Sequence, residues 1–316
     1  MTGTDIAVEA LERLAGTFDG TLAVAARDET TRETVQLNAD REMPTASVIK
    51  LSVLVTVFER ARTGELSLDE RLAVRDSERV GGSGVIKELS AGTELTIRDL
   101  ATYMVVVSDN MATNLLIDAA GGVEAINHFV HDSLGLPAIT LHRKLIHRPG
   151  ASGPLGLAAP RALVALLGDM LAGRVVSARA SADMLAMLAR QQYLDQVPRL
   201  LHREELVDED GGEGRIRVAC KTGWIDGVRA DTGVMWLDGR AVSYAVMSEA
   251  AGDRDRDRDR GRELDADAQL VNAEAGWLLV RHLWPADGSG PPPLVKPHPA
   301  DTWARLHAAA IRDDDA

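Results

Sequence analysis

The sequence predicts an α+β fold of the α/β/α sandwich-like type, with a five-stranded antiparallel sheet built from both chain ends and an inserted all-helical subdomain. Three observations predict it. Two β-like runs lie near the N-terminus, three more follow residue 214, and the block between them has helical patterns. Strands from both ends complete one sheet if the helical block loops out between them. A cleft between the two parts is then the natural place for a site.

The N-terminal part is predicted to hold two helices and a hairpin. The first helix repeats apolar residues at helical spacing. The second is apolar nearly all round and lacks glycine and proline, which fits the centre of a large domain. Between them, two short β-like runs flank a polar turn, the pattern of a hairpin. These elements are a helix over 4–18, strands over 21–26 and 34–37, and a helix over 46–63 that ends at Gly64.

Residues 65–210 are predicted to be mainly helical, and the pattern then returns to strands joined by glycine turns. The clearest helices cover 97–107, 111–119, 123–132, 160–171 and 181–190, with a loop over 141–159. The late elements are strands over 215–221, 232–237 and 242–248, and a last amphipathic helix over 264–283. Between the last strand and this helix, the alternating charges of 253–260 predict a solvated loop.

These elements divide the chain into a helix, a main domain and a tail. A chain of 316 residues is long enough to bury a sizeable core in one such domain. The tail is rich in proline and glycine, so we expect it to be flexible. The predicted parts are an N-terminal helix of the sheet subdomain over 1–17, the main domain over 18–283 with its sheet part at 18–64 and 214–283 and its helical part at 65–213, and the tail over 284–316.

Composition excludes several classes of function. The chain carries 35 basic and 48 acidic residues, and the resulting net charge of −13 disfavours nucleic acid as a partner. The single cysteine, Cys220, excludes an intrachain disulfide and a cysteine-cluster metal centre, and the histidines show no metal-ligand spacing. There is no apolar run of about 18 residues, so no membrane span is expected. We expect neither a metal nor a cofactor; the oligomeric state is left open.

The N-terminus shows no export signal. Its first twenty residues lack a basic segment followed by a continuous apolar one. We therefore expect a cytoplasmic protein, or an extracytoplasmic one if the true start lies upstream. The acidic surplus and the shortage of lysine fit either a salt-rich host or a GC-rich genome.

Ser47 and Lys50 form an S-x-x-K motif at the start of the predicted apolar helix. A spacing of three places the hydroxyl and the amine on one helical face. Serine needs a base to act as a nucleophile, and a lysine with a lowered pKa can be that base. The plainer interpretation is a helix cap and a surface lysine. This interpretation is opposed by the apolar neighbours of Lys50, because burying a charge among them costs free energy that a lysine without a function would not be expected to offset.

Two further motifs lie between predicted elements. Ser108-Asp109-Asn110 separates two helical runs, where Ser108 or Asp109 can also be an ordinary helix cap. Lys221-Thr222-Gly223 ends the first late strand, where it presents a cation and a hydroxyl and lets a substrate backbone lie close. Each motif alone is weak evidence. Their order S-x-x-K, S-D-N, K-T-G is the set found in class A β-lactamases and penicillin-binding proteins.

The sequence therefore resembles the serine β-lactamase and penicillin-binding superfamily, most closely the class A β-lactamase-like serine hydrolases. The resemblance runs from about residue 18 to about 283 and includes the flanking segments GGSG at 81–84 and GVRAD at 227–231. It implies that residues 18–283 are a catalytic domain acting on a small molecule, namely a β-lactam, ester or peptide-like compound with a carboxylate.

The resemblance also implies a role for each motif residue. Ser47 would be the acylated nucleophile, Lys50 its base, Ser108 the relay of the proton to the leaving group, and Asn110 the group that orients Lys50 and binds the substrate amide. Lys221 and Thr222 would hold the substrate carboxylate, and Gly223 would let the substrate approach. The oxyanion hole would be the backbone N–H groups of Ser47 and Trp224, whose side chain either lines the pocket or has a structural role. Arg229 either adds positive charge near Lys221 or pairs with Asp231 or Asp226.

One family element is missing. Class A enzymes deacylate with a glutamate in a loop written R-x-E-x-x-L-N, and the matching segment here places Arg143 correctly but Leu145 at the glutamate position. No Asp or Glu occurs from residue 133 to 168. Because general-base help is worth roughly 10²–10⁴-fold, hydrolysis of the acyl-enzyme is expected to be slow. His142 and His147 are conceivable substitutes near neutral pH, although surface histidines are the plainer interpretation.

These observations leave three functions open. The first is a β-lactamase-like serine hydrolase that acts on cyclic amides through an acyl-enzyme at Ser47. The second is an esterase, peptidase or amidase on the same fold, acting on an intracellular substrate. The third belongs to another class, a penicillin-binding sensor or ligand-binding protein without turnover.

Overall fold

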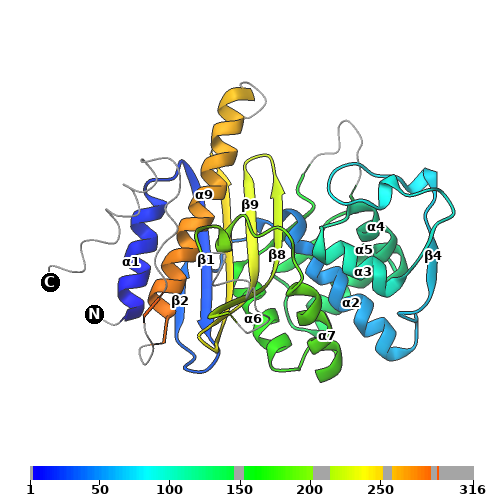
Figure 1. Ribbon diagram of the computed structural model, residues 1–316, viewed down its shortest axis with the longest axis horizontal. Helices are drawn as coiled ribbons and strands as arrows, with labels where there is room; N and C mark the ends of the chain where they lie inside the picture. Colours follow the sequence, from blue (N-terminus) through cyan, green and yellow to red (C-terminus); the bar gives the residue numbers. More distant parts are fainter. Residues whose placement is uncertain (1–2, 146–152, 202–213, 252–257, 286–289, 292–316) are drawn as a thin grey trace.

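A computed structural model describes residues 3–145, 153–201, 214–251, 258–285 and 290–291. Its centre is a five-stranded antiparallel sheet in the order β2-β1-β10-β9-β8 (Figure 1). The strands are β1 (Gly20–Asp28), β2 (Thr34–Leu37), β8 (Ile216–Ile225), β9 (Val228–Leu237) and β10 (Arg240–Ala250). The prediction of one antiparallel sheet assembled from both chain ends is confirmed.

The three late strands are longer than predicted because two-residue turns join them. Ile225 pairs with Val228 across one turn, and Leu237 pairs with Arg240 across the next. In the second turn Asp238 and Gly239 both have positive φ, 49° and 86°, the conformation that matches the twist of paired strands. The sheet therefore continues to the turns, where charged and glycine residues hide the strand pattern in the sequence.

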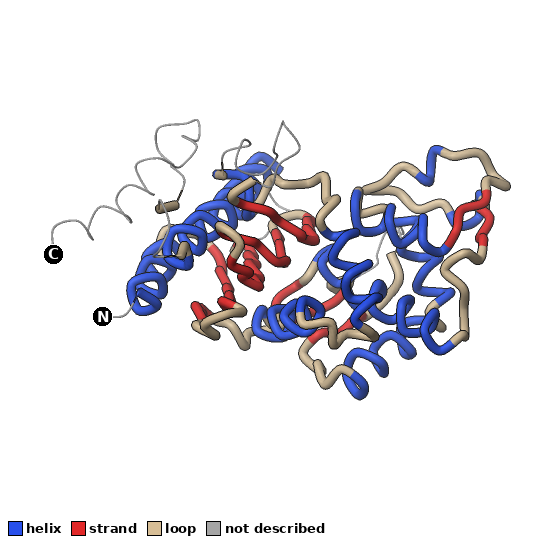
Figure 2. Tube along the Cα trace, turned by 60° about the horizontal axis from the view of Figure 1, so that its bottom comes forward, coloured by secondary structure: helices blue, strands red, loops and turns tan. Residues whose placement is uncertain are grey.

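Helices cover both faces of the sheet (Figures 1 and 2). On one face lie α1 (Gly3–Ala15) and α9 (Arg258–Leu283), which pack against each other. The opposite face meets α6 (Pro160–Leu171) and the remaining helices. A hydrophobic core lies on each face of the sheet, and successive side chains of β10 point alternately into one or the other. Tyr244 and Val246 belong to the core beneath α1 and α9, and Ala245 and Met247 belong to the core on the opposite face.

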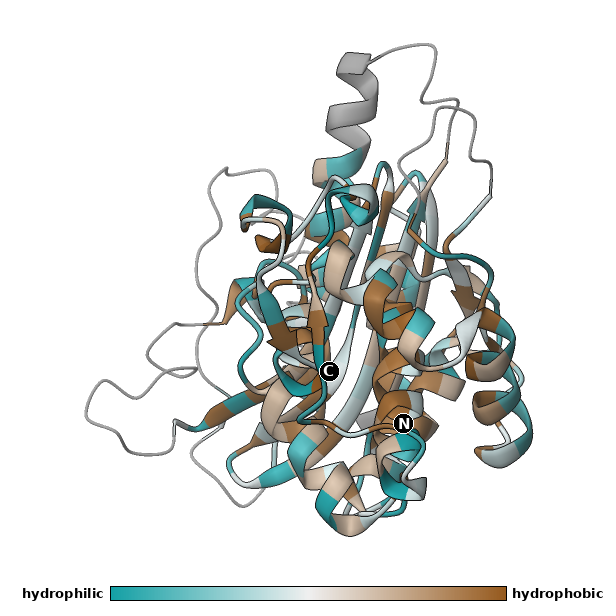
Figure 3. Ribbon diagram, turned by 90° about the vertical axis from the view of Figure 1, so that its right-hand side faces the viewer, coloured by the Kyte–Doolittle hydropathy of each residue, from teal (hydrophilic) through white to brown (hydrophobic). Residues whose placement is uncertain are grey.

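The helical part is confirmed in its main elements. Its helices, besides α6, are α2 (Lys50–Thr63), α3 (Ile97–Val106), α4 (Asn110–Ala119), α5 (Gly122–His128) with a π-turn over Phe129–Ser133, and α7 (Ala178–Leu188). Figure 3 shows apolar stretches along these helices and the neighbouring strands, with hydrophilic residues frequent in the turns. The helices α3, α4, α5 and α7 all pack on α2, which lies at the centre of this core.

Short strands interrupt this part, so it is not all-helical as predicted. A three-stranded sheet joins β3 (Met43–Pro44), β7 (Gly156–Ala158) and β6 (Ile139–Leu141), and a second small sheet pairs β4 (Arg71–Ala73) with β5 (Glu94–Thr96). Short 3₁₀ turns cover Asp76–Glu78, Ile86–Glu88 and Val197–Leu200. Strands of two or three residues are too short to show a period of two, which is why the pattern missed them.

The predicted helix over 46–63 begins differently from expectation. Ala46–Ile49 form a 3₁₀ turn, and the α-helix α2 starts at Lys50. At the other end Gly64 adopts the left-handed conformation, with φ 80°, and its N–H bonds to the carbonyls of Ala61 and Arg60. The predicted end at Gly64 is therefore confirmed.

Several sequence expectations concern segments at the limits of the structure. The predicted tail lies almost wholly outside the described residues. Of the charged run 253–260, residues 258–260 are helical and belong to α9, so this end of the run is not a loop. In the described part of the chain, no helix combines the length and hydrophobicity needed to span a membrane.

Candidate active site

Ser47 lies in the 3₁₀ turn that precedes α2, where β3 leads into the helix. It is half-buried, and among the described residues its hydroxyl makes no hydrogen bond. The preceding residue, Ala46, has a positive φ of 44°, an uncommon backbone conformation for a residue other than glycine. The hydroxyl is thus available to a ligand, and the backbone that presents it is strained.

Lys50 is fully buried, so it is not a surface lysine. Its Nζ donates to the Ser108 carbonyl at 2.7 Å, to the Ser108 Oγ at 3.0 Å and to the Asn110 Oδ1 at 2.9 Å. Burial and the nearby positive charge of Lys221 lower the pKa of Lys50 well below its usual value, against the opposing effect of Asp109. A lysine whose pKa is lowered in this way loses its proton more easily than an exposed lysine and can act as a base.

The turn between α3 and α4 aims two side chains at Lys50. Ser108 has a positive φ of 54°, and Asp109 caps α4 by accepting the Ala112 N–H at 2.9 Å. The cap interpretation is therefore correct for Asp109, while Ser108 and Asn110 point to the lysine. Backbone strain at Ser108, as at Ala46, is typical of a functional site.

A glycine-rich loop holds this turn in place. The second carboxylate oxygen of Asp109 accepts the N–H groups of Val85 and Ile86, at 2.7 and 2.9 Å. Asn110 donates its backbone N–H to the Ser83 carbonyl at 3.0 Å and its side-chain amide to the Gly81 carbonyl at 2.9 Å. The segment 81–86 therefore fixes the orientation in which Asn110 meets Lys50.

The third motif lies on β8, the edge strand of the sheet. Lys221 is fully buried and its Nζ donates to the Thr222 carbonyl at 2.6 Å. Burial lowers the pKa of Lys221 to about 8, against the opposing effect of Asp231. Thr222 is also buried. Lys221 interacts electrostatically with Lys50, so the structure brings the three motifs together.

Gly223 is pressed against the turn that carries Ser47. A Cβ at this position would lie 2.6 Å from the Thr45 carbonyl oxygen and 2.7 Å from the Ser47 backbone nitrogen. Only glycine lets β8 approach the start of α2 this closely. The close approach sets the backbone N–H of Ser47 beside the strand that would supply the second oxyanion donor, from Trp224.

Replacing Gly223 by alanine is expected to push β8 away from Ser47. We expect the free energy of unfolding to fall by about 1–3 kcal/mol, which is typical of overpacking. We also expect the rate of acylation at Ser47 to fall, because the strand moves away from the serine. Urea unfolding and labelling by a penicillin measure the two effects. Gly16→Ala is the matched control, because its Cβ would meet no atom closer than 3.4 Å. Wild-type labelling by the Gly223→Ala protein would show that the close approach is not needed.

Trp224 and Arg229 face each other across the β8–β9 hairpin. Trp224 is 53% exposed, and the Arg229 guanidinium lies 5.9 Å from its ring centroid. Arg229 also bonds to the Ile225 carbonyl at 2.8 Å and approaches the Asp265 carboxylate of α9 at 3.5 Å. The acidic partner is thus Asp265, which pattern reasoning could not find because it lies on a helix far along the chain.

The face of the sheet behind Lys221 carries a buried polar cluster that sequence reasoning missed. Asp231 accepts the Val197 N–H and the Tyr244 hydroxyl, both at 3.1 Å. Burial raises the pKa of Asp231 to about 7 in spite of these bonds. Cys220 points to this face, and burial raises the pKa of its thiol well above the usual value. It packs as a small apolar side chain and not as a nucleophile.

Asn114 holds Leu145, the residue at the predicted glutamate position. Its Oδ1 accepts the Leu145 N–H at 2.9 Å and its Nδ2 donates to the Leu145 carbonyl at 2.7 Å. Asn110 and Asn114 are four residues apart on α4, so they share one face of that helix. This pair of bonds ties Leu145 to the helix that carries the site. The spacing from Asn110 was the only signal of Asn114 in the sequence.

The other loop candidates stay apart from this arrangement. His142 is exposed, and His147 lies outside the described residues. Arg143 bonds to the Gly153 carbonyl at 3.1 Å, and Lys144 pairs with Asp118 of α4. Within the described ranges there is no group of three or more His, Cys, Asp or Glu side chains that could hold a metal.

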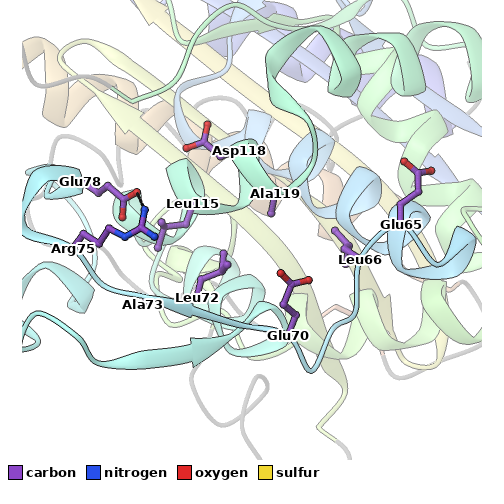
Figure 4. Close-up of a pocket in the computed structure, with 10 residues that line it drawn as sticks. All are labelled: Glu65, Leu66, Glu70, Leu72, Ala73, Arg75, Glu78, Leu115, Asp118 and Ala119. Atoms are coloured by element: carbon purple, nitrogen blue, oxygen red, sulfur yellow. Dashed lines mark ion pairs between the residues drawn. The ribbon is translucent and has the colours of Figure 1, made fainter.

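A hollow of about 290 Å³ lies elsewhere in the helical part (Figure 4). Leu66, Leu72 and Leu115 are among its lining residues, and Glu70 and Asp118 are among its acidic ones. It contains none of the motif residues, so it is separate from the candidate active site.

Comparison with known proteins agrees with this geometry. Residues 7–268 match the model of the β-lactamase enzyme family. The β-lactamase L2 of Stenotrophomonas maltophilia is 28% identical over 236 residues, which cover 74% of this chain and 70% of that protein. The curated relatives of the present chain also include the carbapenem-hydrolysing β-lactamase KPC of Klebsiella oxytoca, which is 27% identical over 77% of this chain and 76% of that protein.

Solved structures show the same similarity. The β-lactamase of Sphaerobacter thermophilus is 30% identical, with a TM-score of 0.70 and coverage of 87% of this chain and 97% of that one. A leucine-to-glutamate mutant of PBP-A, in an acyl-enzyme complex with penicillin G, is 21% identical with a TM-score of 0.73 and coverage of 89% and 96%, which shows the shared fold. The chain belongs to the β-lactamase enzyme family, and it is a serine hydrolase of the class A β-lactamase-like kind.

Proposed function

We propose that the protein is acylated at Ser47 by a β-lactam or a related amide, and that it releases the acyl group slowly. The observation that carries the proposal is the position of Lys50. It is fully buried, its pKa is lowered, it is bonded to Ser108 and Asn110, and it follows Ser47 by three residues. A buried lysine held by two polar side chains is suited to take a proton from a serine and pass it on.

The proposed acylation uses these groups. Neutral Lys50 takes the Ser47 proton while Oγ attacks the carbonyl carbon, and the backbone N–H groups of Ser47 and Trp224 bind the resulting oxyanion. The proton then moves from Lys50 to the Ser108 Oγ, 3.0 Å away, while Ser108 gives its own proton to the leaving nitrogen. The C–N bond breaks and Ser47 carries the acyl group. Lys221 and Thr222 hold the carboxylate of the substrate.

Release of the acyl group needs an activated water. The segment 133–168, which includes the loop, contains no carboxylate, and Leu145 occupies the position at which the family places its glutamate. Asn114 holds the backbone at Leu145, so the register of the loop supports this assignment. Without the carboxylate, we propose that hydrolysis of the acyl-enzyme is slower than its formation.

Intact-mass spectrometry after mixing with benzylpenicillin tests the proposal. We expect one penicilloyl adduct that forms faster than it disappears, mapped to the peptide with Ser47 and absent from Ser47→Ala. Rapid loss of the adduct with release of product would contradict slow deacylation.

The same experiment separates the other two functions. The absence of a loop carboxylate is the observation that favours them. Turnover of a simple ester without a penicilloyl adduct would support an esterase, peptidase or amidase. Neither adduct nor turnover, with reversible binding of penicillin, would support a ligand-binding protein without catalysis.

A further inference from the structure

Gln196 is a buried polar side chain that bonds to the strand of the third motif. It is 1% exposed and directly precedes the 3₁₀ turn Val197–Leu200. Its Nε2 donates to the Gly223 carbonyl at 3.1 Å, and its Oε1 accepts the Asn272 Nδ2 of α9 at 3.0 Å. Both ends of the amide are therefore bonded, at a depth where an unpaired amide would cost free energy.

The Gly223 carbonyl determines which way the two side-chain amides point. A carbonyl oxygen only accepts hydrogen bonds, so the end of Gln196 that meets it must be the NH₂ group. The other end of Gln196 is then an oxygen, and Asn272, which is fully buried, must present its own NH₂ group to it. Reversing either amide would bring two like groups together, so the pair has one stable orientation.

The segment that carries this glutamine is held against one face of α9. Gln269 donates to the Asp195 carboxylate at 2.6 Å. A Cβ at Gly276 would lie 2.5 Å from the Val197 carbonyl oxygen, so the helix is pressed against the chain just after the glutamine. Together with Asn272, the two helix positions are spaced by three and four residues, and they share one face of α9. The glutamine therefore approaches β8 from a fixed base.

The Gly223 carbonyl and the Trp224 N–H belong to one peptide unit. This unit is planar and trans, so its carbonyl and its N–H point in opposite directions and turn together. A bond to the carbonyl therefore sets the direction of the N–H, and it also polarises the unit so that the N–H becomes a stronger donor. Gly223 packs on the backbone nitrogen of Ser47, which places this peptide unit next to the turn that carries the nucleophile.

We propose that Gln196 is a positioning residue for the oxyanion hole, because by holding the Gly223 carbonyl it aims the Trp224 N–H at the oxygen of the reacting carbonyl group. The inference rests on the proposed function, since it concerns the oxyanion of that reaction. A donor stabilises the transition state only if it already points to the position where the charge develops. Loss of the bond is therefore expected to slow acylation by roughly 10- to 100-fold.

Gln196→Met is the first test, because methionine has a similar length but cannot donate to a carbonyl. We expect the limiting rate of acylation by benzylpenicillin to fall roughly 10- to 100-fold, while the concentration that gives half of this rate stays close to the wild-type value. Gln269→Met is the matched control, since it removes a bond between α9 and Asp195 without touching Gly223. Wild-type acylation by Gln196→Met, or an equal loss in both variants, would overturn the inference.

Infrared spectra of the penicilloyl adduct report on the oxyanion hole directly. Benzylpenicillin labelled with carbon-13 at the β-lactam carbonyl gives an acyl ester band whose frequency falls when the carbonyl accepts hydrogen bonds. We expect this band to move to higher frequency in Gln196→Met and to keep its wild-type frequency in Gln269→Met. An unchanged band in Gln196→Met would overturn the inference even if that protein were less stable.

Gln196→Glu tests the same bond through its dependence on pH. Burial raises the pKa of a glutamate, and the protonated acid can donate to the Gly223 carbonyl and accept from Asn272 as the glutamine does. The ionised acid would repel the carbonyl oxygen. The acylation rate, divided by that of the wild type at the same pH, should therefore be close to one at low pH and fall as the pH rises. A ratio as low as that of Gln196→Met at every pH would contradict the role of the bond.

Failure of the proposed function would give a different result. If the wild type forms no penicilloyl adduct, that function fails, and the same variants are compared on p-nitrophenyl acetate, whose hydrolysis at Ser47 also passes through an oxyanion. A loss of hydrolysis in Gln196→Met but not in Gln269→Met then supports the inference. No reaction of the wild type with either compound overturns both.

Discussion

The Leu145→Glu protein is expected to lose its penicilloyl adduct roughly 10²–10⁴-fold faster than the wild type, because a carboxylate at this position can activate the deacylating water. The backbone needed for this is in place. Asn114 binds both the N–H and the carbonyl of Leu145, at 2.9 and 2.7 Å, from the helix that also carries Asn110. The half-buried, partly apolar surroundings of Leu145 are expected to raise the pKa of the new glutamate towards neutral, which suits a general base.

The lifetime of the adduct, followed by intact-mass spectrometry, measures this effect. Leu145→Gln is the matched control, since it has the same length and polarity but no base, and it should keep the wild-type lifetime. Thermal unfolding of both proteins shows whether the loop tolerates a polar side chain. If both proteins are folded and their adducts persist equally, the loop does not present residue 145 to the acyl group, and the correspondence with the family loop is wrong.

Replacing Lys50 by methionine is expected to lower the rate of acylation by roughly 10²–10⁴-fold. Methionine keeps the length and the burial of the side chain but has no proton acceptor. Lys50→Arg tests the role of base separately from the role of the positive charge, because arginine retains the charge and the hydrogen-bond donors but cannot lose a proton near neutral pH. We expect both variants to bind penicillin and to acylate slowly. Wild-type acylation by Lys50→Arg would exclude Lys50 as the base.

The pH dependence of acylation gives an independent check on Lys50. Burial and Lys221 lower the pKa of Lys50, so the fraction that can accept a proton rises with pH at values well below 10. Lys221 has a pKa of about 8, and above that value it loses the charge that holds the substrate carboxylate. The rate for a carboxylate-bearing substrate should therefore rise and then fall with a bell-shaped profile. A profile that is flat between pH 5 and 9 would contradict these roles.

The free energy of unfolding should also depend on pH, because the pKa of Lys50 differs between the folded and the unfolded chain. The folded-state pKa of Lys50 is lower than its unfolded value near 10.4, so between these two values the unfolded chain binds more protons. The wild type therefore gains stability over Lys50→Met as the pH rises through this interval. Urea unfolding of the two proteins at several pH values measures the difference.

Much of the fold was predictable because it depends on residues close together in the sequence. The glycine at position 64 ends α2, and apolar periodicity indicated the helices. The antiparallel sheet followed from strand-like runs at both ends. Errors occurred where a local pattern was too short or hidden, as in β4 and β5 with three residues each, and at the turn through Asp238 and Gly239.

The motif residues of the site were also visible in the sequence. The spacing of Ser47 and Lys50 is a local pattern, and so are the tripeptides S-D-N and K-T-G. Their surroundings were not. Lys50 bonds to Ser108 and Asn110, 58 and 60 residues away, and Arg229 meets Asp265 on α9. Asn114 reaches Leu145 across 31 residues. Contacts over such separations depend on how helices and strands pack, which no local pattern encodes.

The sequence by itself determined the kinds of chemical groups that the protein brings to its site and the group that is missing from its loop. Only the tertiary structure decided that Lys50 is fully buried beside Lys221 and that Gly223 touches the backbone of Ser47. The reason is physical. Side-chain type and spacing are properties of the chain, whereas burial, charge proximity and exposure arise when segments far apart exclude water from one another.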